Sequence, residues 1–506
     1  MISTLEEKPK KEKLSLKESL ISLIFIRANK QVWNYLPFFL MHLLASAYAE
    51  ISPAELVRIG ARSRFKNITN IMKKINVLTE MGIDLHRAIE ITMKKVRLPY
   101  FRGFLQRFAQ VAKLGEDVVA FMNKEYNTFM TIYTSELERS NIRLRRFTEA
   151  YGAVLSSSVL IIVVIIFIGM IWGGSFMVGS TVLATIGIFI SFSMIFYVRS
   201  PLVNIISRNE KKEELFTLIK LDKLIIRITI LSSGAILATM IIKIIPYNLG
   251  PLIQSIIGIP ALVIGYIGRR EIKKIEEIDE RFPDLMTMLS TTLSTIGSSL
   301  LFSIKDICRL NFGKLSIYIK RMAARLELGI SKDTCWSYFK KETSSELVRL
   351  HVDAFAEANS YGSPTKLYGP LISNSSIFML NLRKRVEETT AFMKGIVVPM
   401  HPILCIIIGM VMGLLNIFMN FFKNMPYGIF NIVISSDIYL YSHIIIFVLS
   451  IINAFIIYEV SGEQEFNFSF YLGLFIVIGW ICYYLSLTIV ASFLSSIGFS
   501  NIRPMI

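Results

Sequence analysis

The chain has 506 residues, of which 53% are hydrophobic, and its mean hydropathy is positive. Lys and Arg number 55 against 38 Asp and Glu, which gives a formal net charge of +17 at pH 7. So much apolar sequence exceeds what a soluble core needs, so composition excludes an ordinary globular protein and predicts an all-α, polytopic membrane protein.

The first element is a basic segment, residues 1–35, whose short amphipathic stretch Leu20–Ile26 is suited to lie flat on the inner leaflet. The next apolar stretch, Trp33–Ala49, has no charge but contains a proline and a histidine. If it crossed the membrane, the many cations that follow would be exported. We therefore expect a buried helix at the start of a first cytosolic helical domain, residues 36–153.

Four transmembrane helices are expected in residues 154–267. They form two hairpins with uncharged outer turns, joined by a basic cytosolic loop, residues 199–227. A second cytosolic helical domain, residues 268–394, follows, and residues 395–506 add about three transmembrane helices. The predicted spans are Val154–Ile171, Val178–Val198, Ile228–Ile245, Gly250–Ile267, Ile396–Met419, Ile438–Tyr458 and Phe470–Leu494.

The topology rests on the distribution of positive charge. Nearly all Lys and Arg lie before the first span or in the two segments 199–227 and 269–394, so these segments and the N-terminus are predicted to be cytoplasmic. The last two spans are joined by an acidic connection that contains Glu459, Glu463 and Glu465. The topology of this part stays open.

The two cytosolic domains repeat one pattern. Residues of like character recur at helical spacing, which indicates one amphipathic helix used twice and a small antiparallel bundle in each domain. An insertion in the second domain, around residues 352–376, shifts the register of the repeat. The paired positions of the repeat motif are Gly82 with Gly297, Leu85 with Leu300 and Gly115 with Gly329.

Beyond the insertion, the repeat continues towards the membrane. The membrane-proximal basic residues Arg143 and Arg145 correspond to Arg383 and Arg385, where topology alone already requires cations. Within the spans that follow, Gly169 and Gly173 correspond to Gly409 and Gly413. Glycines four residues apart allow close helix packing, either of the first span against the fifth, within one chain or across a dimer, or of either against a substrate helix.

Motifs for chemistry are missing from the sequence. It contains no Gly-rich phosphate loop, its five histidines are isolated from one another, and its four cysteines are far apart. We therefore expect no catalytic, metal-binding or cofactor-binding residues and no cofactor. Cations interleaved with acids over long segments also argue against nucleic-acid binding.

Basic pairs on the predicted outer faces of the cytosolic domains are either solvated surface or docking sites for an acidic soluble partner. These candidates are Lys73, Lys74, Lys94, Lys95, Lys340 and Lys341.

At the repeat positions the chain resembles the type II secretion F-domain family, the membrane platforms of type IV pilus, type II secretion and archaellum machines. The resemblance covers about Leu36–Met419, and the layout is most similar to archaellum platforms, with archaeal adhesive-pilus platforms close behind. The matching features are Gly82 to Leu85, Gly297 to Leu300, the turns at Phe312-Gly313 and Leu328-Gly329, and Glu357 with Gly362.

The resemblance implies a non-enzymatic protein of the cell membrane. Its implied partners are a cytosolic hexameric secretion ATPase that docks on the cytosolic domains, filament subunits of the archaellin or pilin type, other motor-complex proteins and the lipid bilayer. A homodimer is also expected. The spans would pass motion from the ATPase to subunits leaving the bilayer and, in an archaellum, would yield rotation.

Two other classes stay open. A secondary transporter also uses internal repeats, but it would carry ionisable residues in its spans. A purely structural membrane scaffold would bind no ATPase.

Overall fold

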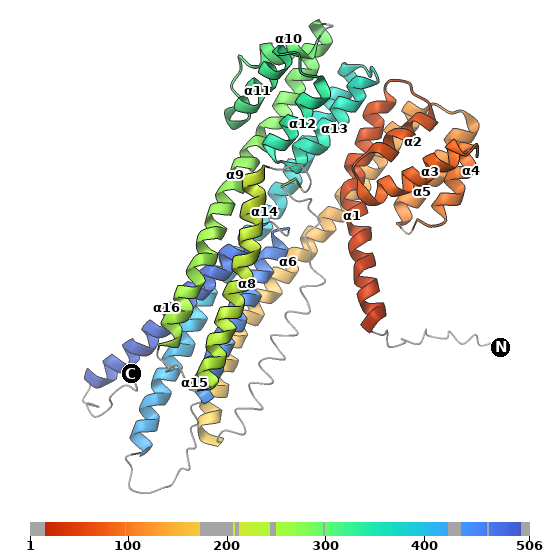
Figure 1. Ribbon diagram of the computed structural model, residues 1–506. Coiled ribbons are helices and arrows are strands. Elements are labelled where there is room, and N and C mark those ends of the chain that lie inside the picture. Colours follow the sequence, from red (N-terminus) through yellow and green to blue (C-terminus); the bar gives the residue numbers. More distant parts are fainter. Residues whose placement is uncertain are drawn as a thin grey trace, which may run out of the picture. The chain divides into compact units, whose positions relative to one another are not determined.

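The computed structural model describes residues 16–96, 98–172, 206–207, 212–242, 249–296, 299–423, 437–462 and 465–496. These residues are almost all α-helical and contain no β-strand (Figure 1). Five described helices are long and apolar enough to cross a membrane. The predicted class, an all-α polytopic membrane protein, is confirmed.

The chain divides into two compact units, residues 1–133 with 353–375, and residues 134–352 with 376–506. These units do not follow the predicted domain boundaries, because α6, α13 and α14 each contribute residues to both. The described helices are α1 (Leu16–Ala47), α2 (Pro53–Arg62), α3 (Lys66–Glu80), α4 (Leu85–Met93), α5 (Pro99–Leu114), α6 (Val118–Trp172), α8 (Glu213–Ile241), α9 (Gly250–Ile296), α10 (Leu300–Ile307), the 3-10 turn η1 (Gly313–Leu315), α11 (Ser316–Glu327), α12 (Lys332–Thr343), α13 (Glu346–Ser360), α14 (Thr365–Lys423), α15 (Asp437–Val460) and α16 (Asn467–Ser496).

The first unit is built around the second half of α1. Phe39 is fully buried and packs edge-on against Phe65 and Phe101, with ring centroids 5.8 and 6.1 Å apart. Short connections fold α2 to α5 around this helix, and Gly115 ends α5 in the left-handed conformation, at a φ of 68°. Residues 33–47 of the apolar stretch Trp33–Ala49 thus belong to a buried helix of a helical bundle, and the predicted buried helix is found.

The insertion of the second domain completes this first unit. Glu357 of α13 lies 3.4 Å from the Nε2 atom of His42 on α1. The hydroxyl of Tyr361 donates a hydrogen bond to Glu55 of α2 at 2.8 Å. Ser363 donates one to the carbonyl of Ser46 at 3.4 Å. Residues 353–375 therefore belong to the core of a unit whose other residues come from the start of the chain.

The second unit contains a helical head at the far end of α9. Phe282 and Leu289 of α9 are buried with Ile304 of α10, Ile319 of α11 and Phe339 of α12. The short turn η1 is held to α9 by an ion pair between Lys314 and Glu277 at 2.6 Å. Apolar residues at helical spacing on each of these helices form one common core.

His351 on α13 makes the stability of the second unit depend on pH. The ring is fully buried, its Nδ1 atom lies 2.8 Å from the carbonyl of Leu347, and burial lowers its pKa to about 4. In the unfolded chain the histidine binds a proton near pH 6.5, so above that pH the buried neutral ring contributes fully to the free energy of unfolding. This contribution, roughly 3 kcal/mol, is lost as the pH falls towards 4.

We expect the melting temperature of detergent-solubilised His351→Phe to fall less than that of the wild type between pH 7 and 4.5. A His86→Gln variant, altered at a partly exposed histidine of α4, is the control. Equal losses in wild type and His351→Phe would contradict this assignment.

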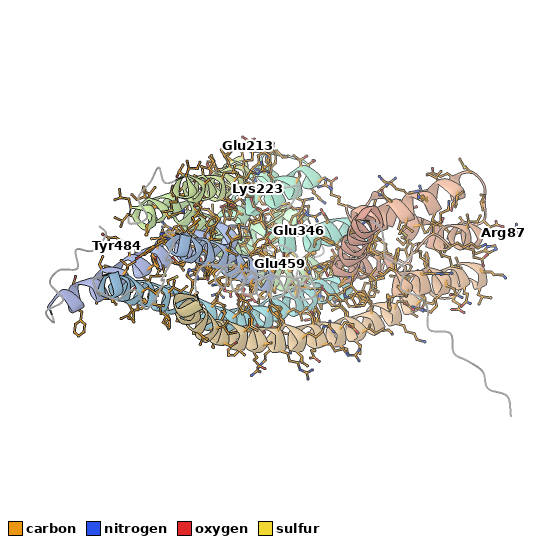
Figure 2. The ribbon with its side chains drawn as sticks, turned by 90° about the horizontal axis from the view of Figure 1, so that it is seen from below. Arg87, Glu213, Lys223, Glu346, Glu459 and Tyr484 are labelled. Carbon is orange, nitrogen blue, oxygen red and sulfur yellow. The ribbon has the colours of Figure 1, made fainter. Side chains whose placement is uncertain are left out.

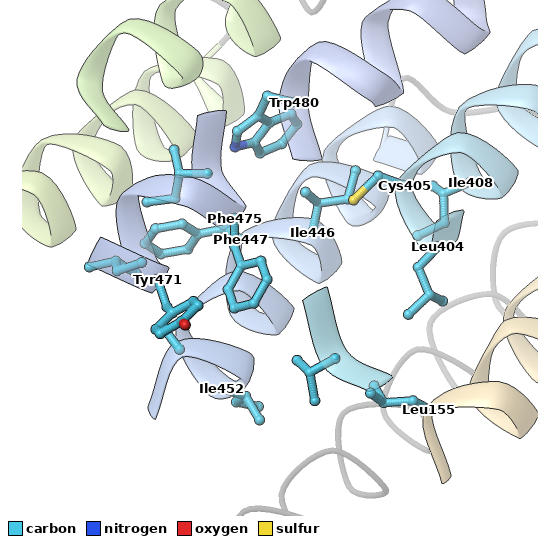
Figure 3. Packing of buried hydrophobic residues seen from close by; sticks show 14 of the residues in the cluster. Leu155, Leu404, Cys405, Ile408, Ile446, Phe447, Ile452, Tyr471, Phe475 and Trp480 are labelled. Atoms are coloured by element: carbon cyan, nitrogen blue, oxygen red, sulfur yellow. The ribbon is translucent and has the colours of Figure 1, made fainter. Parts of the chain in front are cut away.

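The apolar helices of the second unit share one core. Leu155 of α6, Leu404 of α14, Phe447 of α15 and Phe475 of α16 converge there (Figure 3). The five candidate spans correspond to the last five predicted ones. The first predicted span lies on α6, and the second, Val178–Val198, lies outside the described residues.

The residue just before α16 packs against α8 and α9. Phe466 is buried among Leu215 of α8 and Ile272 and Ile275 of α9. The guanidinium of Arg269 lies 4.3 Å from the ring centroid of Phe470. Figure 2 shows Glu459, at the end of α15, among the helices. One cation from α9 thus lies beside the first turn of α16.

Candidate functional site

The predicted docking lysines are not all accessible. Lys73, Lys74, Lys94 and Lys95 are exposed on α3 and at the end of α4, and Arg87 on α4 lies at the outer edge of the same unit (Figure 2). Lys341 is half exposed, with its Nζ atom 4.0 Å from Glu213 of α8.

The expectation that Lys340 lies on an outer face is wrong, because this side chain is only 8% exposed. The buried face of α12 runs through Cys335, Trp336 and Phe339 and continues over Lys340 to Thr343. The apolar residues of this helix already occur at helical spacing in the sequence.

One membrane-proximal arginine forms a buried ion pair. Arg383 of α14 donates to the Oδ2 atom of Asp279 on α9 at 2.7 Å, and the exposed fractions of the two side chains are 11% and 0%. Ser345, just before α13, donates to the other carboxylate oxygen. Three helices are thereby tied together at one carboxylate.

This ion pair lies in a part of α9 that is rich in ionisable side chains, beyond the apolar part of the helix at residues 250–267. Burial raises the pKa of Asp279, while Arg383 and Ser345 act in the opposite direction. Burial, helped by Glu387, raises the pKa of Glu276 to about 7. Charged groups are thus held close together between α9 and α14, where a shift of either helix changes their interactions.

Arg385, the other predicted membrane-proximal arginine of α14, contacts α6. It donates to Glu138 at 3.2 Å, and Thr389 donates to Asn141 at 2.8 Å. Between these contacts lies a cavity of about 540 Å³ with apolar and polar walls. In α6 the corresponding Arg143 and Arg145 are exposed, and Arg145 pairs with Glu149 at 3.3 Å. The matching arginines of the predicted repeat therefore make different contacts.

The glycines of α14 meet α16. A Cβ atom added to Gly409 would lie 2.6 Å from the carbonyl oxygen of Tyr483, and one added to Gly413 would lie 2.9 Å from a methyl group of Val490. The first span was the expected partner within the chain, whereas the structure places the last helix against these glycines. Gly169 lies on α6, and Gly173 lies outside the described residues.

The turn glycines of the repeat motif adopt similar backbones where they are described. Gly115 and Gly329 follow α5 and α11 with φ angles of 68° and 77°, and Gly82 has a φ of 88° after α3. Leu85 and Leu300 begin α4 and α10. Gly297 lies outside the described residues, and the repeat of the whole domain stays a prediction.

A closer glycine contact, between α9 and α16, was not predicted. A Cβ atom on Gly473 would lie 2.3 Å from the backbone nitrogen of Leu262, and one on Gly265 would lie 2.4 Å from that of Phe470. Gly258 also faces α16, and Gly268 faces the ring of Phe466, the residue just before that helix. We call this set, Gly258, Gly265, Gly268 and Gly473, the glycine seam. The spacing of the three α9 glycines is visible in the sequence, but their partner helix, α16, is not.

A buried polar network joins four apolar helices. Tyr151 of α6 donates to Asn453 of α15 at 2.5 Å, and the Asn453 amide lies 3.0 Å from the Nδ1 atom of His401 on α14. The Nε2 atom of His401 lies 3.2 Å from the carbonyl of Phe475 on α16. A neutral imidazole with its proton on Nε2 satisfies both contacts. Buried polar contacts of this kind fix the relative rotation of helices in lipid.

Among the described residues there is no group of three or more His, Cys, Asp or Glu side chains that could hold a metal ion. The contacts of the second unit are suited to transmitting force between helices. Its long helices extend beyond the apolar bundle and are joined to one another by glycine packing, a buried ion pair and a polar network.

Comparison with known proteins gives three findings. The family model described as type II secretion system protein F matches residues 39–172. A protein named Flagella accessory protein J from Methanocaldococcus jannaschii is 24% identical over 470 residues, which are 87% of this chain and 82% of that protein. A protein of the same name from Methanococcus voltae is 25% identical over 308 residues, 58% of this chain and 54% of its own length. No solved structure matches.

Proposed function

We propose that this chain, whose residues 39–172 carry a domain of the type II secretion protein F family, is the integral-membrane platform of an archaellum or a related type IV pilus-like machine. The observation that carries the proposal is the similarity to Flagella accessory protein J over 87% of the chain. The helical membrane architecture agrees with a platform role. An adhesive-pilus platform is the nearest alternative within the family.

In this proposal the chain couples a cytosolic secretion ATPase to the insertion of filament subunits and, in an archaellum, to rotation. Extracting an apolar helix of about 20 residues from lipid is costly, and the sequence has no phosphate-binding loop of its own, so the work must come from a partner. In this proposal the N-terminus and both helical domains lie on the cytosolic side of the membrane.

Continuous helices support the coupling. The 47 residues of α9 correspond to about 70 Å of helix, of which only the first part is apolar. The 59-residue α14 likewise continues from a charged part into a span. Because Asp279 and Arg383 join these two helices, a force on the helical head would reach the spans through rigid elements.

Binding of the ATPase tests the proposal. The full-length protein in lipid nanodiscs is mixed with the purified secretion ATPase of the same organism, and affinity and ATP hydrolysis are measured. We expect binding, accelerated hydrolysis and at least a tenfold loss of affinity for Lys73→Glu with Lys74→Glu, because opposite charges steer and hold such partners. The pair at Lys94 and Lys95 and the single Lys341→Glu are tested alongside.

Lys124→Glu, at an exposed lysine of α6, is the matched control for charge reversal. Lys340 is left unchanged because reversing a buried charge would unfold α12. The full chain is needed because residues 353–375 complete the first unit. If the wild type neither binds the ATPase nor changes its rate, the transporter and scaffold readings gain.

A further inference from the structure

Two cations from different helices meet over one aromatic ring at the start of α16. The guanidinium of Arg269 on α9 lies 4.3 Å from the ring centroid of Phe470 and 5.4 Å from that of Tyr471. The Nζ atom of Lys394 on α14 lies 5.7 Å from the same Tyr471 centroid. Both basic side chains are partly buried, and Tyr471 is fully within the core. Helices α9, α14 and α16 thus hold two like charges close together.

Neither cation has an acidic partner in the part of the chain that the structure describes, where Arg269 and Lys394 form no ion pair with Asp or Glu. Burial lowers the pKa of Lys394 and Arg269 lowers it further, while Glu387 and Glu276 act in the opposite direction. These two acids lie seven residues further along their helices, which is about 10 Å further from the apolar segments. Two charges that disfavour each other are therefore left without an anion between them.

Both cations lie at the level where a bilayer carries its phosphate groups. Arg269 follows the predicted span Gly250–Ile267 by two residues, and Lys394 precedes the predicted span Ile396–Met419 by two residues. Two residues correspond to about 3 Å of helix, whereas the headgroup layer is about 5–7 Å thick on each side of the hydrocarbon core. Tyr266, 63% exposed, is an aromatic residue of the kind found at this boundary.

The surroundings of Lys394 leave room for a headgroup. A Cβ atom added to its neighbour Gly395 would meet no other atom within 4 Å. The aliphatic part of a lysine side chain is flexible, so its ammonium group can follow a bound anion. Arg269 is the more fixed of the two, because its planar guanidinium stacks on the rings of Phe470 and Tyr471.

We propose that Arg269 and Lys394 bind the phosphate group of a membrane lipid at the headgroup level, between α9 and α14. The guanidinium presents parallel N–H groups to two phosphate oxygens, and the ammonium group supplies a second positive charge. Basic sites between membrane helices bind anionic headgroups in this way. The bound phosphate removes the repulsion between the two cations. It also adds a second link between the helices that Asp279 and Arg383 already join.

The test measures lipid binding by the full-length protein, purified in detergent and depleted of lipid. Phosphatidylglycerol is added, its Kd is measured by native mass spectrometry, and the melting temperature is recorded. We expect the lipid to raise the melting temperature of the wild type. Arg269→Gln with Lys394→Gln should raise the Kd at least about tenfold, because two charge-assisted contacts are lost.

Arg270→Gln with Lys384→Gln is the matched control. It also removes one cation from each of the two helices, but both of these side chains are exposed. We expect its Kd to stay within about twofold of the wild-type value, because exposed charges far from other groups interact weakly.

A second variant separates lost binding from lost folding. Lys394→Glu provides Arg269 with a carboxylate from the chain itself, so the melting temperature without lipid should be at least that of the wild type. Added phosphatidylglycerol should no longer raise it. A rise as large as in the wild type would contradict the assignment.

Inorganic phosphate is the second probe. If it displaces phosphatidylglycerol and stabilises the wild type equally well, the site takes a soluble phosphate and the lipid assignment is wrong. Equal lipid affinity of the wild type and the Arg269 and Lys394 double variant would refute the site itself. These measurements involve no ATPase, so a negative result leaves the proposed function untouched.

Discussion

Replacing Asp279 by alanine is expected to lower the free energy of unfolding by about 3–5 kcal/mol, because it leaves the guanidinium of Arg383 buried without its partner. The same carboxylate accepts from Ser345, so α13 loses a contact as well. The measurement is thermal unfolding of the detergent-solubilised protein, followed by intrinsic fluorescence.

Arg385→Ala is the matched control for this prediction. Arg385 lies two residues from Arg383 on α14, but its pair with Glu138 has both side chains more than half exposed. Exposed pairs contribute about 0–1 kcal/mol. A double variant, Asp279→Leu with Arg383→Leu, should recover much of the loss, because it removes both charges. Equal destabilisation by Asp279→Ala and Arg385→Ala would refute the assignment.

Gly473→Ala is expected to destabilise the membrane bundle by about 3 kcal/mol, at the upper end of the range for overpacking. The added methyl group would lie 2.3 Å from the backbone nitrogen of Leu262 and 2.8 Å from the carbonyl oxygen of Gly258. Backbone atoms of a packed helix cannot turn aside, so α16 must move away from α9. Gly265→Ala should behave alike, because its methyl group would meet the backbone of Phe470.

Other glycines of the same bundle provide graded controls. A Cβ atom on Gly250 would meet only the flexible end of Met240, which can rotate, so Gly250→Ala should cost less. Gly234 and Gly395 have open space around that position, and alanine there should be neutral or stabilising. The melting temperature should be lowest for Gly473→Ala, higher for Gly250→Ala and highest for Gly234→Ala. A different order would contradict the close packing of the glycine seam.

Much of the helical architecture could be predicted from the sequence because it depends on local patterns. Long apolar stretches gave the spans, and the charges that follow Trp33–Ala49 identified this stretch as a buried helix. In the structure most of this stretch is buried in α1. These inferences use only length, periodicity and charge, which one chain displays directly.

The partners across helices could not be predicted in the same way. Arg383 looked like a cation required by topology, and only the fold shows that it meets Asp279, far away in the sequence. Lys340 was placed outside because a lysine is rarely buried, although the apolar spacing of α12 runs through it. A pattern of small residues predicts that another helix packs closely, but it does not identify that helix. The glycines of α9 and α14 pack against α16, which the sequence did not indicate.

The discontinuous first unit has a consequence for synthesis. Its early helices leave the ribosome long before residues 353–375, which supply Glu357, Tyr361 and Ser363 to α1 and α2. About 220 residues separate the two parts, and at roughly 5–20 residues per second their translation takes on the order of 10 to 50 s. During that interval part of the apolar face of α1 stays exposed, while the intervening spans enter the bilayer. We therefore expect this unit to need a chaperone more than any other part of the nascent chain.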